Sequence, residues 1–236
     1  MADDTGSRMK RGVLSGKAGA VLGLLLISIF GLVPVALADD CYGDTYRCNV
    51  EAQRSPVVSW PRGVSSSFPT VGGTVTNDIV NSVSVLADPS NGTESGWYLG
   101  AGRNRFNPFA VHVFNGLYYE HDAASPAGNF TFQYLTRYDA LGPDWEIEAI
   151  NNGTVWMDYT YYNPSFVTGY AVTNVERHAS TDVFSGTPTF TSLQALSSNT
   201  WSFWPAAACY VHDDTLYQDN FFTNPTKVTV TQGVNC

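Results

Sequence analysis

The sequence contains very little lysine and has few basic residues overall. Its 236 residues include 12 Lys or Arg against 21 Asp or Glu, which gives a formal net charge of −9. Four basic and two acidic residues lie in the first 38 positions, so the remainder carries 8 − 19 = −11, and its only lysine is Lys227. No basic track is available for phosphates, so a nucleic-acid partner is not expected. A negative surface this poor in lysine also argues against binding to anionic lipid.

Long apolar runs are missing after residue 38. The one such run, AGAVLGLLLISIFGLVPVALA, follows four basic residues and ends in Ala-Leu-Ala at 36–38. This pattern predicts a signal peptide over residues 1–38, cleaved to leave a secreted, extracellular chain that no longer contacts the membrane. The alternative is an uncleaved membrane anchor, because the run is nearly long enough to span a bilayer.

Cysteine is scarce, and all four cysteines follow the apolar run: Cys41, Cys48, Cys209 and Cys236. An even number in an exported chain predicts two disulfides. Of the three possible pairings, we expect Cys41–Cys48 with Cys209–Cys236, because these bonds close short loops and hold the chain ends, which otherwise fray. The spacing does not suggest a zinc site, and no cofactor is expected.

Helical periodicity is absent as well. From residue 77 onward, short segments rich in aromatic and β-branched residues alternate in part and end at Gly, Pro or Asn. Residues 77–236 are therefore predicted to form one all-β domain, a two-sheet antiparallel β-sandwich or jelly roll of the concanavalin-like kind. Residues 39–76, which include the Pro-, Ser- and Gly-rich stretch SPVVSWPRGVSSSFPTVGGTV, are expected to form an extended, disulfide-containing N-terminal arm.

Two Asn-Gly pairs, at 115–116 and 152–153, give the strongest short hairpin signal. The first predicts the pairs Phe114–Leu117, Val113–Tyr118, His112–Tyr119 and Val111–Glu120. The second predicts Ile150–Val155, Glu148–Met157 and Glu146–Tyr159, which places the acids of DWEIEA (144–149) on one face with tyrosines. Aromatic rings offer large contact areas for a ligand, or simply fill a core. The ligand-binding candidates are Tyr118, Trp156, Tyr159, Tyr161, Glu146 and Glu148.

The acids of DWEIEA have two interpretations. Retaining glycosidases need two carboxyl groups about 5–5.5 Å apart, and alternate strand positions lie about 6.5–7 Å apart, a gap that side chains can close. The Asp-x-Glu-x-Glu row differs from the Glu-x-Asp-x-x-Glu row of laminarinase-like enzymes, so a solvated or groove-lining strand is favoured. The sequence contains no Gly-x-Ser-x-Gly elbow, so a serine hydrolase is not indicated.

A second acidic candidate lies in TNVERHA, residues 173–179. On a strand, Glu176 shares a face with Val172, Asn174 and His178. Partial desolvation there would raise the pKa of Glu176 and suit it to general acid/base work. The alternative is a rim acid paired with Arg137 or Arg177, and the local pattern alone favours this reading.

The order of the segments GWYLGAG, YYEHD, WEIEAINNGTVWMDYTY and TNVERHA resembles that of the glutamic peptidases (eqolisin family) and their secreted bacterial relatives, over about Gly96 to Leu196. The resemblance implies a β-sandwich with a catalytic glutamine and glutamate on its concave face. The glutamate corresponds to Glu176. The glutamine should fall near Val111–Val113, where this sequence has none and His112 is the nearest polar residue. Its oxyanion-stabilising role is therefore unfilled.

The resulting expectation is a secreted, non-catalytic module that binds an extracellular polysaccharide or peptide. The alternative is an acid-acting endopeptidase like the glutamic peptidases, in which Glu176 works with His112 or Glu120. A second alternative is a structural or adhesive surface protein. Whether Glu176 and His112 enter one groove is the geometric question that the sequence leaves open.

Overall fold

The computed structural model describes residues 48–55, 60–102, 106–123, 129–179, 181–212, 214, 217–223 and 226–233. The predicted signal peptide, Cys41 and Cys236 lie outside these residues. Neither Cys48 nor Cys209 is a free thiol, and the predicted pairing stays a prediction. Within the described ranges no helix is long and apolar enough to cross a membrane.

All regular structure among these residues is β-strand. The strands are β1 (Cys48–Ser55), β2 (Gly63–Pro69), β3 (Gly73–Thr74), β4 (Asp78–Asp88), β5 (Asn91–Gly100), β6 (Asn107–Phe114), β7 (Leu117–Asp122), β8 (Thr131–Asp139), β9 (Asp144–Asn151), β10 (Thr154–Tyr162), β11 (Tyr170–Arg177), β12 (Val183–Phe184), β13 (Thr189–Ser197), β14 (Thr200–Phe203), β15 (Ala206–His212), β16 (Tyr217–Thr223) and β17 (Thr226–Gln232).

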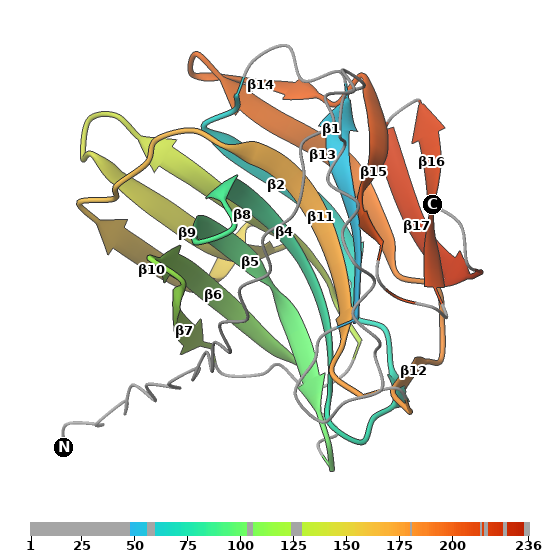
Figure 1. The fold of residues 1–236 in the computed structure, drawn as a ribbon. Coiled ribbons are helices and arrows are strands. Elements are labelled where there is room, and N and C mark those ends of the chain that lie inside the picture. The colour runs from blue at the N-terminus through green and yellow to red at the C-terminus, as the bar shows by residue number, and fades with distance from the viewer. Residues whose placement is uncertain are drawn as a thin grey trace, which may run out of the picture.

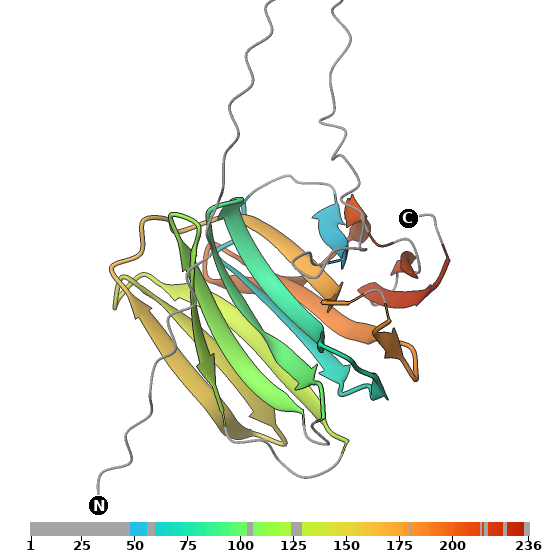
Figure 2. The same ribbon diagram turned by 60° about the horizontal axis from the view of Figure 1, so that its bottom comes forward.

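Two large antiparallel sheets face each other, as Figures 1 and 2 show. The first sheet has the order β15-β1-β11-β4-β5-β6-β7, and the second has β10-β9-β8-β2-β13-β17-β16, with β14 beside β13. Strands β12 and β3 form a small separate pair. The predicted all-β sandwich is therefore confirmed.

The core lies between the sheets and follows strand alternation. In β9, Trp145, Ile147 and Ala149 are fully buried, whereas the acids between them point outward. Two polar contacts also join the sheets: the Ser95 hydroxyl donates to the Glu148 carbonyl at 2.8 Å, and the hydroxyls of Thr136 and Thr93 lie 2.7 Å apart. Thr93 and Ser95 therefore identify the inner face of β5.

Residues 39–76 were predicted to form an extended N-terminal arm. Where the structure describes them, they contribute strands to the two large sheets. Strand β1 lies between β15 and β11, and β2 lies between β8 and β13, so both are interior strands. The serines of β2 suit this position because their hydroxyls are satisfied across strands: Ser66 donates to the Thr191 carbonyl at 2.9 Å, and Ser65 accepts from Gln133 at 3.0 Å. A composition typical of loops thus conceals a buried strand.

The first predicted hairpin is confirmed in every pair, from Phe114–Leu117 to Val111–Glu120. The second keeps its Asn-Gly turn and the Ile150–Val155 pair, but the register shifts between Val155 and Met157. Because the bulge at Trp156 adds one residue to β10, every later side chain changes face. Glu148 pairs with Asp158 and Glu146 with Thr160, so the predicted face shared by these acids and the tyrosines is wrong.

Gly96 lets β5 approach β4 closely at the centre of the first sheet. A Cβ atom at this position would lie 2.1 Å from the Asn81 carbonyl oxygen and 2.6 Å from the Ser82 Cβ. We expect Gly96→Ala to lower the free energy of unfolding by about 3 kcal/mol, because backbone must move to admit the methyl group. Urea denaturation measures the loss. Gly72→Ala is the control, since its Cβ would meet only the Ser185 hydroxyl at 3.2 Å; equal losses in the two variants would contradict the explanation.

Candidate functional site

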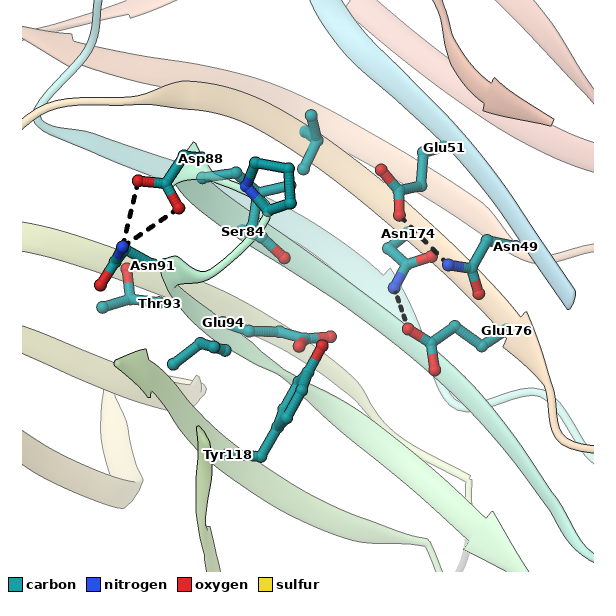
Figure 3. A pocket seen from close by; sticks show the side chains of 15 residues that line it. Asn49, Glu51, Ser84, Asp88, Asn91, Thr93, Glu94, Tyr118, Asn174 and Glu176 are labelled. Carbon is teal, nitrogen blue, oxygen red and sulfur yellow. Dashed lines mark hydrogen bonds between the residues drawn. The ribbon is translucent and has the colours of Figure 1, made fainter. Parts of the chain in front are cut away.

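A groove with a volume of about 290 Å³ lies on the outer face of the first sheet, the face turned away from the second sheet. Its floor comes from β1, β11, β4 and β5, and Val113 and Tyr118 of the β6–β7 hairpin add to one side (Figure 3). The carboxylates in its lining belong to Glu51, Asp88, Glu94 and Glu176.

Strand register brings the polar groups of the groove together. Strand β11 lies between β1 and β4, with Asn174 opposite Glu51 on one side and Ser82 on the other. Two residues further along, Glu176 lies between Asn49 and Val80. Residues paired across antiparallel strands share a face, so strands distant in sequence supply one continuous polar row.

Glu176 is buried in this groove, with 4% of its surface exposed. The Asn174 amide donates to Oε1 at 2.5 Å, and the His178 Nε2 lies 2.9 Å from Oε2. His178 also lies 3.6 Å from the Asp78 carboxylate. Both oxygens of Glu176 are thus held by neighbours on its own strand face, which fixes the carboxylate for binding or for proton transfer.

The predicted arginine partners of Glu176 lie elsewhere. Arg137 pairs with Glu146 at 2.5 Å on the second sheet. Arg177 follows Glu176 directly and therefore points to the opposite face, where its guanidinium meets Asp214 at 2.7 Å. Glu176 is an interior strand residue, and the interpretation of it as a rim acid is wrong.

Glu94 of β5 provides a second carboxylate to the same groove. It accepts a hydrogen bond from the Ser82 hydroxyl, and Ser82 is the cross-strand partner of Asn174. In Figure 3 the carboxyl groups of Glu94 and Glu176 point toward one another, with the Tyr118 ring beside Glu94. Neither Glu94 nor Glu51 was predicted as a site residue, although the alternation of Glu94 with Gly92 and Gly96 in the sequence was a usable signal.

His112 lies on the other face of the first sheet. It pairs with Thr93, whose hydroxyl points into the core. Its imidazole stacks on Tyr161 at 4.0 Å between ring centres, and Nδ1 lies 3.1 Å from the Tyr159 hydroxyl. Burial, aided by the nearby His121, lowers the pKa of His112 to about 4. His112 and Glu176 therefore share no groove, and His112 cannot assist Glu176 by contact.

The groove-facing positions of β6 are apolar. Phe109, Val111 and Val113 form a buried cluster with Val80, against which Tyr98 packs. No amide side chain occupies the stretch where the family resemblance places the glutamine. Glu120 is exposed on β7, pairs with Val111 and is not part of the groove lining.

The ligand-binding candidates fall in separate places. Tyr118, with 47% of its surface exposed, lines the groove. Tyr159 and Tyr161 lie with His112 between the sheets, and burial raises the pKa of both. Trp156 is at the bulge against Phe132. Glu146 and Glu148 face outward beside Arg137, so these six residues form no single platform.

Known proteins of similar structure identify the fold that carries this groove. No family model matches the chain. Nor does any curated protein. Among solved structures, scytalido-glutamic peptidase with a peptide-based transition-state analogue matches with a TM-score of 0.60 and 11% identity, over 80% of this chain and 98% of that one. The chain has the fold of the glutamic peptidases.

A second glutamic-peptidase structure agrees. SCP-B, a member of the eqolisin family in complex with the tripeptide Ala-Ile-His, matches with a TM-score of 0.57 and 11% identity, over 80% of this chain and 98% of that one. The resemblance inferred from the sequence is confirmed at the level of fold.

Among the described residues, no group of three or more His, Cys, Asp or Glu side chains is placed to hold a metal ion.

Proposed function

We propose that this protein is an exported module that binds extended peptides in the groove on the outer face of the first sheet and does not cleave them. The observation that carries the proposal is the apolar face of β6. Val111 and Val113 occupy the stretch where a hydrolase of this fold needs an amide, while His112 faces the core. Without a side-chain amide to stabilise the oxyanion, Glu176 is proposed to hold the peptide and not to cleave it.

Peptide is favoured over glycan because of the walls of the groove. Among the lining residues that the structure describes, Tyr118 is the only aromatic side chain, whereas stacking on sugars needs ring platforms. Asn49, Asn174 and the glutamates instead offer hydrogen-bonding groups at strand spacing, which suits an extended backbone. The two similar structures named above hold a peptide-based analogue and a tripeptide.

An acid endopeptidase is the second candidate, and Glu94 is the observation that favours it. Its carboxyl group enters the same groove as Glu176. In that reaction Glu176 would take a proton from water as the water oxygen attacks the carbonyl carbon, and protonated Glu94 would polarise the carbonyl. The leaving nitrogen would then receive the proton as the C–N bond breaks.

One experiment separates the two candidates. The purified protein is immobilised and exposed to casein fragments from about pH 2 to pH 7, a range in which carboxyl groups titrate. Retention and newly formed amino groups are both measured. We expect saturable retention and no new amino groups, and in Glu176→Gln a retention weakened by about tenfold, the size of a lost charge-assisted hydrogen bond.

Asp158→Asn is the matched control, because Asp158 is exposed on the second sheet; it should behave as wild type. Cleavage that disappears in Glu176→Gln would establish the peptidase instead. Absence of both retention and cleavage would overturn peptide binding.

A further inference from the structure

We infer that one side of the groove is sensitive to acid: protonation of two histidines between the sheets loosens the β6–β7 hairpin, which carries Tyr118, and releases the bound peptide. This inference rests on the proposed peptide-binding function and concerns its regulation, with the peptide held near neutral pH and released in acid. It follows from a stack of five rings that joins the edges of the two sheets.

The ring stack connects two edge strands. Strand β7 ends the first sheet and β10 ends the second. The rings belong to His112 of β6, Tyr119 and His121 of β7, and Tyr159 and Tyr161 of β10. His112 stacks on Tyr119 at 4.5 Å and on Tyr161 at 4.0 Å between ring centres. His121 stacks on Tyr159 at 3.8 Å. A histidine of the first sheet therefore takes part in each of these contacts with the second sheet.

Uncharged imidazoles suit this stack. His112 is 8% exposed, and its Nδ1 lies 3.1 Å from the Tyr159 hydroxyl. Burial raises the pKa of Tyr159, so the hydroxyl keeps its proton and can donate a hydrogen bond to a neutral Nδ1. Burial, together with the nearby His121, lowers the pKa of His112 to about 4. Burial also lowers the pKa of His121, against an opposing effect of Asp122. Both imidazoles are thus neutral near pH 7 and become charged in acid.

The groups that face the two imidazoles are, in the described part of the chain, largely neutral. They are Thr93 of β5, the apolar core positions of β9 and the three tyrosines of the stack. Asp122, beside His121, supplies a carboxylate, but it is exposed and accepts a hydrogen bond from the Tyr98 hydroxyl at 2.9 Å. Once both imidazoles are protonated, two like charges lie 6.5 Å apart between ring centres, and their repulsion is strong where water is excluded. Acid therefore weakens the contact between the two edge strands.

The hairpin that carries the histidines also forms one side of the groove. Because side chains alternate along a strand, Tyr119 and His121 face the second sheet while Tyr118 faces outward and lines the groove. Its cross-strand partner, Val113, lines the groove as well. Strand β7 is the last strand of its sheet and has β6 as its neighbour, so weaker stacking loosens the segment that positions Tyr118. The effect of acid on the core side of the hairpin thereby reaches the groove on its outer side.

Hydrogen exchange of the unmodified protein tests the first step. Amide protection is compared at about pH 7 and about pH 3, below the pKa of His112, after correction for intrinsic exchange rates. We expect protection at 117–122 and 157–162, on the edge strands, to fall about tenfold or more relative to protection at 79–85 in the interior strand β4. Equal changes at the edges and in β4 would overturn the inference.

Peptide release is measured with the immobilised protein and casein fragments. Retention should be about tenfold weaker at about pH 3 than at about pH 7. The double variant His112→Phe with His121→Phe keeps two rings and removes their charge, so the loss of retention in acid should shrink to about threefold or less. A remainder is expected because carboxyl groups titrate in the same range. Asp158→Asn, at an exposed position of β10, should behave as wild type.

The outcomes separate the regulation from the function. Retention that weakens equally in the wild type and the double variant would overturn the role of the histidines and leave peptide binding standing. Retention that does not change between the two pH values would overturn the release. Absence of retention at any pH would overturn the proposed function itself, while hydrogen exchange would still decide whether acid opens the edges. Because the exchange comparison needs no variant, misfolding of the double variant would not rescue the inference.

Discussion

Replacing Arg177 with methionine should lower the free energy of unfolding by about 3–5 kcal/mol, the penalty for leaving one member of a buried ion pair without its partner. The Arg177 and Asp214 side chains are each 2% exposed. Two hydrogen bonds of 2.7 Å join them, and the guanidinium also donates to the Asp182 carbonyl at 3.0 Å. Removal of the cation leaves the Asp214 carboxylate buried without this neutralisation. Equilibrium urea denaturation at neutral pH measures the loss.

Two further variants test whether the loss of stability in Arg177→Met comes from the buried ion pair. Arg177→Met combined with Asp214→Leu should recover most of the stability, because apolar side chains of similar volume replace a buried pair with little or no net loss. Arg137→Met, at a pair with Glu146 in which the arginine side chain is 41% exposed, should lose less than about 1 kcal/mol. A double variant no more stable than the single one would contradict the ion-pair explanation.

The ion pair also bears on the groove, because Arg177 and Glu176 are consecutive residues on opposite faces of β11. Arg177 ties the end of this strand to Asp214, which in turn accepts from the Tyr217 backbone N–H at 3.2 Å. In Arg177→Met, hydrogen exchange of the amides at 174–177 should therefore accelerate, since local opening frees the strand end that carries Glu176. Stability of the core and orientation of the groove are linked through two adjacent side chains.

The sequence predicted the local features of the fold better than the long-range ones. The turn at Asn115-Gly116 fixes its hairpin because both residues adopt positive φ, 51° and 76°, which Asn and Gly tolerate. The second Asn-Gly turn is equally well formed, yet one extra residue at Trp156 reverses the faces beyond it. No glycine marks this bulge, so the alternation pattern alone could not reveal it.

The site was predictable only in part, for the same reason. Glu176 was identified through a family resemblance, whereas the groove that Glu94 and Glu51 share with it follows only from the placement of β5 and β1 on either side of β4 and β11. Which face of a strand meets a groove depends on its neighbours in space, and these come from distant parts of the chain. His112 shows the converse: a polar residue close in sequence to the expected glutamine position faces the core with Tyr159 and Tyr161.

Asp219 should make the protein more stable in acid than at neutral pH. It lies on β16, is 3% exposed, and neither carboxyl oxygen has a hydrogen-bond partner within the described residues. Burial raises its pKa from 3.8 to about 7. Between these values the folded state holds a proton that the unfolded state has released, so the free energy of unfolding falls as pH rises from about 4 to about 7.

Asp219→Asn removes this titration. At 1.36 kcal/mol per pKa unit, the buried Asp219 carboxylate lowers the free energy of unfolding by about 4 kcal/mol. Because the asparagine amide is also a buried polar group, we expect Asp219→Asn to raise the free energy of unfolding by about 2–4 kcal/mol at pH values above about 7. The gain should vanish below about pH 4, where the Asp219 carboxyl is protonated in both the folded and the unfolded protein. Thermal unfolding across this range measures the difference, with exposed Asp158→Asn as the control. A gain that is independent of pH would show that the carboxyl does not titrate in this way.

This prediction changes how pH profiles of the groove must be interpreted. His112 contributes in the opposite sense. Burial lowers its pKa from 6.5 to about 4, so its contribution to the free energy of unfolding is lost as pH falls between these two values. Two groups outside the groove, Asp219 in the β16–β17 hairpin and His112 between the sheets, therefore titrate in the range where a carboxylate-lined groove is tested. Peptide retention measured in Asp219→Asn removes the larger of these contributions. A pH dependence of retention that disappears in this variant comes from Asp219 in the scaffold, whereas one that persists is independent of Asp219.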